Sequence, residues 1–370
     1  MRQVYRGAAA LLLNTTVALL LVEGLAAGVL AIDHGVRRPT VAEAFYATQP
    51  WGAAYVQESR YLAEQAAPHV GWQLAPLTGR YINVETSGLR ATPGARCEKG
   101  AFTVFVLGGS AVMGEGVPDE FTVPAVLQRA IAARTSRPVC VRNLGSPAWV
   151  STQSVISLLR RLQAGDRPDL VIVHDGYNDA VTAGEGLPAG DSLPVVVSEA
   201  PSDMDRIGAS FLRLVQATHL YAIVQRATQK AQALFSAGTS GPDAPVDLAA
   251  ATRAYETNAD TIRALGERFG FRYAFFWQPT LWVKAGTLTP EEERARKEAS
   301  AKPVNVEAVR TMYARMREEV ARHDRQFYLG DLFDGVPGVF YLDEAHLTPD
   351  GNARVAARII DAVAGDLPGR

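Results

Sequence analysis

The chain has 370 residues, of which 48% are hydrophobic and 21% are charged. This composition is ordinary for a globular protein and excludes an intrinsically disordered or collagen-like chain. Lysine and arginine total 37 and aspartate and glutamate total 39, so the formal net charge is −2. There is no basic excess to attract nucleic acid, so we expect no nucleic-acid partner. The two cysteines are too few for a disulfide scaffold or a four-cysteine zinc site.

The first predicted element is an apolar segment over residues 7–32, in which Glu23 is the only charged residue. A span of about 20 apolar residues crosses a bilayer core, so residues 1–32 are interpreted as an N-terminal membrane anchor. Two arginines precede the segment and place the N-terminus in the cytoplasm, whereas two that follow it weaken this signal: Arg2 and Arg6, and Arg37 and Arg38. A cleaved signal segment and a buried soluble helix remain as alternatives.

Export of the remaining chain follows from either an anchor or a signal peptide, and it makes a disulfide chemically possible. Cys97 lies just before one predicted strand and Cys140 lies inside another. The two residues form either a disulfide or two partly buried thiols, because pairing requires a specific Cα separation that the sequence does not give.

The remaining chain divides into a juxtamembrane linker and irregular entry segment over residues 33–95, rich in proline, glycine and aromatic residues, and one alternating α/β domain over 96–370. Short apolar runs rich in β-branched residues predict buried parallel strands at 102–107, 138–143, 169–174, 271–278 and 326–332. Helices are predicted near 121–134, at 246–269 and near 303–322. Two more are predicted after N-cap residues at Ser151 and Thr348. This alternation predicts a parallel sheet with helices on both faces.

Residues 180–245 do not fit the alternation and are interpreted as a helical insertion. Glycine and proline fill its first part, and apolar residues at helical spacing follow: Ile207, Phe211, Leu214, Tyr221 and Val224. The insertion is either a lid that shapes the substrate site or a peripheral packing helix.

Polar, glycine-bearing loops follow the predicted strands or precede the last helix. They are Gly108–Gly114, Asn143–Ser146, Asp175–Asp179 and Asp343–His346. In an open parallel sheet, ligands bind outside the carboxyl ends of the strands. We therefore expect these loops to converge on one edge of the sheet and to form the functional site.

The residues of these loops fill the roles of an acyl-transfer site. Ser110 is a candidate nucleophile, and a serine requires an adjacent base, which His346 can provide. Asp343, three residues before His346, can orient the imidazole. A tetrahedral intermediate requires hydrogen-bond donors for its oxyanion, and the candidates are the N–H groups of Ser110 and Gly145 and the side chain of Asn178.

Other interpretations of the same residues are weaker. The Gly-Gly-Ser loop lacks the lysine of a phosphate-binding loop, and it lacks the G-x-S-x-G nucleophile elbow of α/β-hydrolases. Taken by itself, a serine in a turn such as that of Ser110 is more often structural than a nucleophile. A histidine such as His346, taken by itself, is more often a capping or core residue than a base. Asp343 and His346 have no further well-spaced metal ligands in the sequence, so we expect no metal at this site.

The loops resemble, in order, the sequence blocks of the SGNH/GDSL hydrolase superfamily. Ser110 lies in VLGGSAVMGEGV, Gly145 in VRNLGSPAW, Asn178 in the Gly-x-Asn-Asp block GYND, and His346 in the Asp-x-x-His block DEAH. The resemblance spans about residues 102–365. Gly109 departs from the pattern, because many members carry aspartate there, and Gly-Gly-Ser variants are similar to a bacterial, membrane-anchored subset.

The resemblance implies a flavodoxin-like three-layer α/β/α fold with strand order 2-1-3-4-5, and an enzyme that acts on ester bonds without a cofactor. The implied function is a serine esterase that removes short, acetyl-like acyl groups from an extracytoplasmic glycan or lipid ester. An O-acyltransferase and a non-catalytic envelope-binding module are the alternatives. The expected location is the bacterial cytoplasmic membrane, with a single span and a periplasmic catalytic domain.

Overall fold

The structure is a computed structural model that describes residues 13–29, 39–192, 218–221, 223–224, 246–302 and 304–369. The chain divides into two units, Met1–Pro39 with Ala200–Gly241, and Thr40–Glu199 with Pro242–Arg370. Most of the predicted insertion over 180–245 lies outside the described residues, including Ile207, Phe211 and Leu214.

In the first unit, residues 13–29 form a helix whose leucine side chains are exposed. Its one carboxylate, Glu23, accepts hydrogen bonds from the backbone N–H groups of His219 and Leu220 at 2.6 and 3.2 Å. Glu23 also lies 2.8 Å from Nδ1 of His219. Within the described part of the chain, no helix combines the length and the apolar character needed to cross a membrane. Residues 7–12 and 30–32 of the predicted span lie outside that part.

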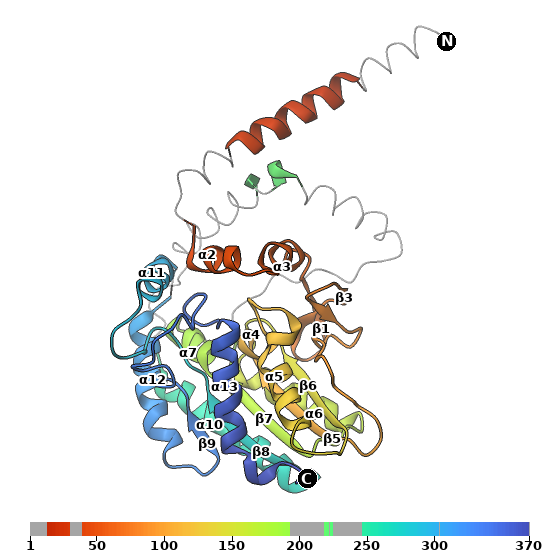
Figure 1. The fold of residues 1–370 in the computed structure, drawn as a ribbon. Coiled ribbons are helices and arrows are strands. Elements are labelled where there is room, and N and C mark those ends of the chain that lie inside the picture. Colours follow the sequence, from red (N-terminus) through yellow and green to blue (C-terminus); the bar gives the residue numbers. More distant parts are fainter. Residues whose placement is uncertain are drawn as a thin grey trace. The chain divides into compact units, whose positions relative to one another are not determined.

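A five-stranded parallel sheet forms the centre of the second unit (Figure 1). Its strands, in spatial order, are β6 (Val139–Gly145), β5 (Phe102–Gly108), β7 (Leu170–Asp175), β8 (Arg272–Trp277) and β9 (Gln326–Tyr328). Each neighbouring pair is parallel. The expected strand order 2-1-3-4-5 is therefore confirmed, with β5 as the first strand of the sheet along the chain.

Helices cover both faces of the sheet. Val104 and Val106 of β5 pack in one buried cluster with helices α5 (Val123–Ala132) and α13 (Pro349–Ala362). Phe105 and Leu107 belong to the opposite cluster, with α6 (Ser151–Gln163) and α10 (Leu248–Phe269). Because successive side chains of a strand point to opposite faces, two covered faces require the continuous apolar run seen in β5.

The remaining elements of the α/β part lie around the sheet. They are α4 (Ser110–Met113), η1 (Asp119–Phe121), α7 (Tyr177–Gly184), α11 (Pro290–Ala299), α12 (Val306–Val320) and η2 (Ala364–Asp366). Thr348 caps α13 as predicted, because its Oγ1 accepts the N–H of Gly351 at 3.3 Å. The expectation that Ser151 caps α6 is wrong, since Val150 holds that position and Ser151 Oγ donates to Asp179 at 2.5 Å.

Within the segment predicted as a linker and irregular entry segment, residues 39–95 form regular elements. They contain helices α2 (Val41–Thr48) and α3 (Gly52–Ser59) and the antiparallel pairs β1 (Glu64–Ala67) with β2 (Gly71–Leu74), and β3 (Leu77–Thr78) with β4 (Asn83–Val84). Side chains from these elements bury Met113 of α4 in a common core: Trp51, Tyr55, Leu74, Ile82 and Val84. Elements of two to eight residues are too short for a periodic sequence signal.

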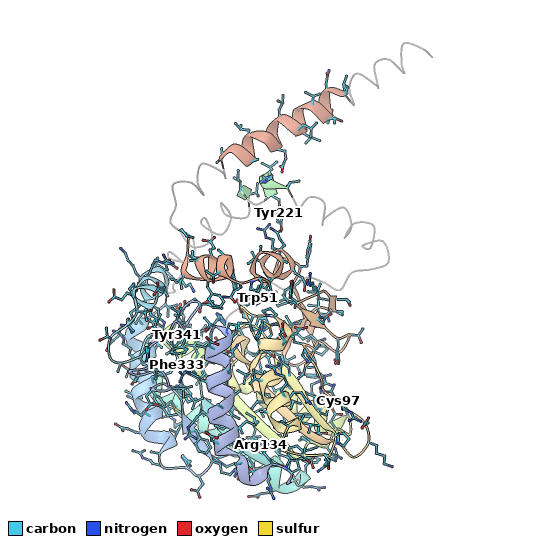
Figure 2. The ribbon with its side chains drawn as sticks, viewed as in Figure 1. Trp51, Cys97, Arg134, Tyr221, Phe333 and Tyr341 are labelled. Carbon is cyan, nitrogen blue, oxygen red and sulfur yellow. A yellow bond between two sulfur atoms is a disulfide. The ribbon has the colours of Figure 1, made fainter. Side chains whose placement is uncertain are left out.

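Cys97 and Cys140 form a disulfide with a Cα separation of 4.7 Å (Figure 2). This pairing decides between the two alternatives left by the sequence. It joins the chain segment just before β5 to the neighbouring strand β6, 43 residues further along the chain.

Candidate active site

Ser110 begins helix α4 at the carboxyl end of β5, after two glycines that allow a close approach of neighbouring backbone. A Cβ at Gly108 would lie 2.2 Å from the carbonyl oxygen of His174, and one at Gly109 would lie 2.6 Å from Asn178 Nδ2. The contact at Gly108 is with backbone and requires glycine there, whereas a side chain at Gly109 would require the Asn178 amide to move. The two glycines therefore bring the Ser110 turn against the end of β7 and the start of α7.

The structure brings Ser110, His346 and Asp343 together, although Ser110 and His346 are 236 positions apart. Nε2 of His346 lies 2.8 Å from Ser110 Oγ, and Nδ1 of His346 lies 2.8 Å from Asp343 Oδ2. The other oxygen of Asp343 accepts the backbone N–H groups of Ala345 and His346, both at 2.8 Å. This local turn fixes the carboxylate and the imidazole relative to each other.

A second carboxylate lies beside the imidazole, and the sequence analysis did not identify it. Oε2 of Glu115 is 3.4 Å from His346 Nε2. Burial alone would lower the pKa of His346, but the charge of Asp343, followed by that of Glu115, outweighs burial and raises this pKa. Burial likewise opposes the charge of Asp343, but His346 and the two backbone N–H groups lower the pKa of Asp343 below its usual range.

Asn178 lies next to Ser110, while the rest of its block is structural. Its amide donates to Trp149 O at 2.8 Å, which leaves the second amide hydrogen for another acceptor. Gly176 has φ +108°, and a Cβ there would lie 2.4 Å from the ring of Trp277. Asp179 is buried and accepts the N–H and the hydroxyl of Ser151, so it joins the start of α7 to the start of α6.

Gly145 is close to Ser110, but its backbone N–H is already used. That N–H donates to Oδ1 of Asn143 at 3.0 Å, and a Cβ at Gly145 would lie 2.2 Å from the backbone nitrogen of Met113. Gly145, the predicted oxyanion donor, is therefore a position where β6 packs closely against α4 and leaves no room for a side chain. The structure supplies a physical reason against its expected role, since one N–H cannot serve two acceptors well.

The turn after Gly145 contains another candidate donor. Ala148 has φ +56°, a conformation that side-chain-bearing residues adopt rarely. Its N–H has no acceptor among the residues that the structure describes. Trp149 O, the next carbonyl, lies 3.1 Å from the Cβ position of Gly109, so this turn lies against the nucleophile loop.

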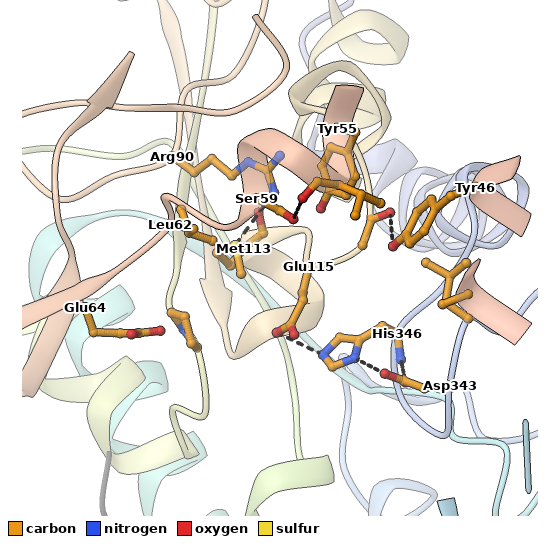
Figure 3. A pocket seen from close by; sticks show the side chains of 15 residues that line it. Tyr46, Tyr55, Ser59, Leu62, Glu64, Arg90, Met113, Glu115, Asp343 and His346 are labelled. Carbon is orange, nitrogen blue, oxygen red and sulfur yellow. Dashed lines mark hydrogen bonds and ion pairs between the residues drawn. The ribbon is translucent and has the colours of Figure 1, made fainter. Parts of the chain in front are cut away.

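A cavity of about 390 Å³ opens on His346 and Asp343 (Figure 3). Its lining includes residues from the segment that the sequence predicted as a linker: Tyr46, Tyr55, Leu62 and Glu64. Glu115, Gly116, Pro147 and Leu342 contribute from the loops of the α/β part. The aromatic residues between positions 39 and 95 are a sequence signal that could have indicated packing of this stretch onto the site.

The buried side chain of Arg90 stabilises the loop that follows Ser110. Its buried guanidinium pairs with Asp119 at 2.8 Å and donates to the carbonyl oxygens of Met113, Gly114 and Val117. Burial raises the pKa of Asp119, and the charge of Arg90 opposes that shift. Among the described residues, no group of three or more histidine, cysteine, aspartate or glutamate side chains could hold a metal ion.

No protein-family model and no curated protein sequence matches the chain. Solved structures with a similar fold include a lipolytic protein of the G-D-S-L family from Veillonella parvula, at 12% identity and a TM-score of 0.38 over 70% of this chain and 97% of that one. A carbohydrate acetylesterase family member from Sinorhizobium meliloti has 14% identity and a TM-score of 0.38, over 71% and 96% of the two chains. The lipase/acylhydrolase from Enterococcus faecalis has 14% identity and a TM-score of 0.34, over 72% and 98%. At these sequence identities and TM-scores, the comparison does not assign individual site residues of this chain.

Proposed function

We propose that the chain is a serine esterase that hydrolyses short acyl esters, with Ser110 as nucleophile, His346 as general base and Asp343 as the orienting carboxylate. The observation that carries this proposal is the unbroken series of 2.8 Å contacts from Asp343 through His346 to Ser110, beside a cavity that His346 and Asp343 line. A nucleophile, its base and an orienting group within hydrogen-bond reach are the signature of an activated serine.

The first chemical step forms an acyl-serine. With Nδ1–H of His346 donating to Asp343, Nε2 is the acceptor for the Ser110 hydroxyl hydrogen. Ser110 Oγ attacks the ester carbonyl carbon as its proton moves to Nε2. The tetrahedral intermediate then collapses, the bond to the leaving alcohol breaks, and His346 returns the proton to that alcohol.

The second step releases the acyl group to water. His346 takes a proton from a water molecule, whose oxygen attacks the acyl carbonyl. The bond to Ser110 Oγ breaks, and His346 gives the proton back to this oxygen. The product is the free carboxylic acid, and the step uses only groups of the chain and water.

The oxyanion of both intermediates requires donors aimed at it. We assign this role to the N–H of Ser110, the side chain of Asn178 and the N–H of Ala148, which replaces Gly145. The Ser110 and Ala148 N–H groups are without acceptors within the described residues, and Asn178 retains one amide hydrogen. Gly145 then contributes by allowing β6 to pack closely beneath α4.

The substrate class that we propose is an acetyl-like ester of a glycan or lipid outside the cytoplasm. Residues 1–32 are proposed as a membrane anchor of a bacterial cytoplasmic membrane, and residues 96–370 as the periplasmic catalytic domain with its insertion over 180–245. Support comes from the apolar N-terminal sequence and from the Cys97–Cys140 disulfide, since disulfides persist in oxidising compartments.

The deciding experiment measures hydrolysis of p-nitrophenyl acetate by the full chain and by Ser110→Ala. We expect the variant to lose at least about 10³-fold in kcat, because the remaining donors alone give little turnover. Mass spectrometry should detect an acetyl group on Ser110 in the wild-type chain. Ser300→Ala is the matched control, since Ser300 is exposed at the end of α11. Equal activity in Ser110→Ala and wild type would refute the proposal.

A further inference from the structure

A four-residue turn over 146–149 carries the backbone N–H that we assign to the oxyanion. The last N–H of the turn donates to its first carbonyl oxygen at 3.4 Å. Pro147 is the second residue of the turn, and Ala148 is the third, with φ +56°. Proline at the second position and a positive φ at the third are features of a type II turn. Pro147 also lines the cavity beside His346, so the peptide group between Pro147 and Ala148 adjoins that cavity.

An alanine at the third position of such a turn is strained. Types I and II differ by a reversal of the central peptide group, and the commoner type I gives the third residue a negative φ, which alanine adopts without strain. Reversal of the peptide between Pro147 and Ala148 would therefore relieve Ala148. It would also turn the Ala148 N–H to the opposite side, because the C=O and N–H of a trans peptide group point in opposite directions. Another contact must hold this peptide group in its present orientation.

Trp72 of strand β2 makes that contact. Its indole Nε1 donates to Pro147 O at 2.7 Å, and Trp149 Nε1 donates in return to Trp72 O at 3.1 Å. The two tryptophans are buried in one apolar cluster. Reversal of the peptide group would take the acceptor away from Trp72 Nε1, and a buried donor without an acceptor is costly. The hydrogen bond therefore opposes the relaxation of Ala148.

The hairpin that carries Trp72 is anchored separately on helix α6. Gln153 Nε2 donates to Val70 O at 2.7 Å, and Arg160 Nη1 donates to Pro68 O at 2.9 Å. Both acceptors lie in the turn between β1 and β2. The position of Trp72 is therefore set by contacts other than the one with Pro147, so its indole can serve as a fixed donor.

We infer that Trp72 is a positioning residue for catalysis, whose indole N–H holds the Pro147 carbonyl so that the Ala148 N–H is presented to the oxyanion. This inference rests on the proposed esterase function. A hydrogen bond to the carbonyl oxygen also polarises the peptide group, which makes its N–H a stronger donor. Trp72 does not line the cavity beside His346, so it acts through Ala148 and not on the substrate.

The test replaces the indole by a ring without a donor, in Trp72→Phe of the full chain. We expect kcat for p-nitrophenyl acetate to fall about tenfold with KM within about twofold, because the oxyanion develops only after the substrate is bound. This loss is smaller than the about 10²–10³ for complete removal of an oxyanion donor, since part of the population keeps the present peptide orientation. Arg160→Met is the matched control, because Arg160 is exposed and bonds the same hairpin away from Pro147, and it should keep the wild-type kcat.

A second substitution separates the orientation of the peptide group from a general loss of structure. Glycine adopts a positive φ without steric cost, so Ala148→Gly removes the strain that favours reversal. Trp72→Phe should therefore cost only about threefold in kcat in the Ala148→Gly background, a coupling that a double-mutant cycle measures. A thermal melt checks that each variant is folded. A wild-type kcat in folded Trp72→Phe, or an equal loss in both backgrounds, overturns the inference.

A measurement on the wild-type chain covers two other outcomes. If p-nitrophenyl acetate forms no acetyl-Ser110, the esterase proposal has failed, and if Trp72→Phe does not fold, its kinetics cannot be compared. NMR with 15N-tryptophan and proline labelled with 13C at the carbonyl then detects the coupling across the hydrogen bond from Trp72 Nε1 to Pro147 O. Within the described ranges no other indole N–H donates to a proline carbonyl, so one signal is expected. That signal supports the positioning contact, and its absence overturns the inference.

Discussion

The side-chain amide of Asn178 occupies the space that a side chain at Gly109 would need. A Cβ at position 109 would come within 2.6 Å of Asn178 Nδ2, and the same amide is held by a 2.8 Å hydrogen bond to Trp149 O. A side chain at position 109 would therefore require the Asn178 amide to move away from the turn that contains Ser110.

Gly109→Ala should therefore displace Asn178 and lower kcat for p-nitrophenyl acetate. If Asn178 is an oxyanion donor, its removal in Asn178→Ala costs about 10²–10³ in kcat, and Gly109→Ala should approach that loss. Gly365→Ala is the matched control, because a Cβ there has no neighbour within 4 Å. A wild-type kcat in Gly109→Ala would show that catalysis does not depend on the position of the Asn178 amide.

The sheet and the meeting of Ser110, His346 and Asp343 could be predicted from the sequence for the same reason. Buried parallel strands are continuous apolar runs, and such runs mark where the functional loops begin. Ser110 and His346 were therefore expected at one edge although 236 positions separate them. Their proximity follows from the order of the strands in the sheet and from the short turn that joins Asp343 to His346.

The identity of the backbone donor could not be predicted. Gly145 has the residue type that an oxyanion donor favours, but the rotamer of Asn143 commits its N–H. Glu115 was missed because it is one glutamate in a glycine-rich loop, and only its 3.4 Å distance from His346 distinguishes it. Side-chain contacts of this kind depend on packing that no local pattern encodes.

The positive φ of Ala148 gives a prediction about the turn whose N–H we propose as an oxyanion donor in place of Gly145. Ala148→Gly should keep kcat within a few-fold, because glycine adopts φ +56° without steric cost. Ala148→Val should lower both kcat and the midpoint of thermal unfolding, since a β-branched residue is strongly disfavoured there. Steady-state kinetics and a thermal melt measure both effects. A fully active Ala148→Val would remove this N–H from the mechanism.

The two carboxylates around His346 predict an alkaline pH dependence. The free imidazole is the base, and Asp343 and Glu115 raise its pKa against the effect of burial. We therefore expect kcat/KM to rise with pH as His346 loses its proton, with a midpoint above the ordinary value of about 6.5. Glu115→Gln removes one negative charge, so its midpoint should move to lower pH.

The pH profile of kcat/KM for 3,3-dimethylbutyl acetate measures this shift without a charged substrate. Glu344 contributes a smaller effect of the same sign, and Lys302 pairs with Glu344 at 2.6 Å. Glu318→Gln should keep the wild-type midpoint. An identical midpoint in Glu115→Gln and wild type would mean that Glu115 does not act on the protonation of His346.

The Cys97–Cys140 disulfide predicts a stability effect that is separate from activity. Closing a loop of 43 residues restricts the unfolded chain, so the Cys97→Ser/Cys140→Ser double variant should lose about 2–4 kcal/mol in the free energy of unfolding. Urea unfolding with and without reductant measures this loss. Reductant should lower the midpoint of the wild-type chain and leave that of the double variant unchanged. Neither cysteine lines the cavity beside His346, so kcat under native conditions should stay near the wild-type value. Equal urea midpoints in the two proteins would show that the bond adds nothing to the stability of the fold.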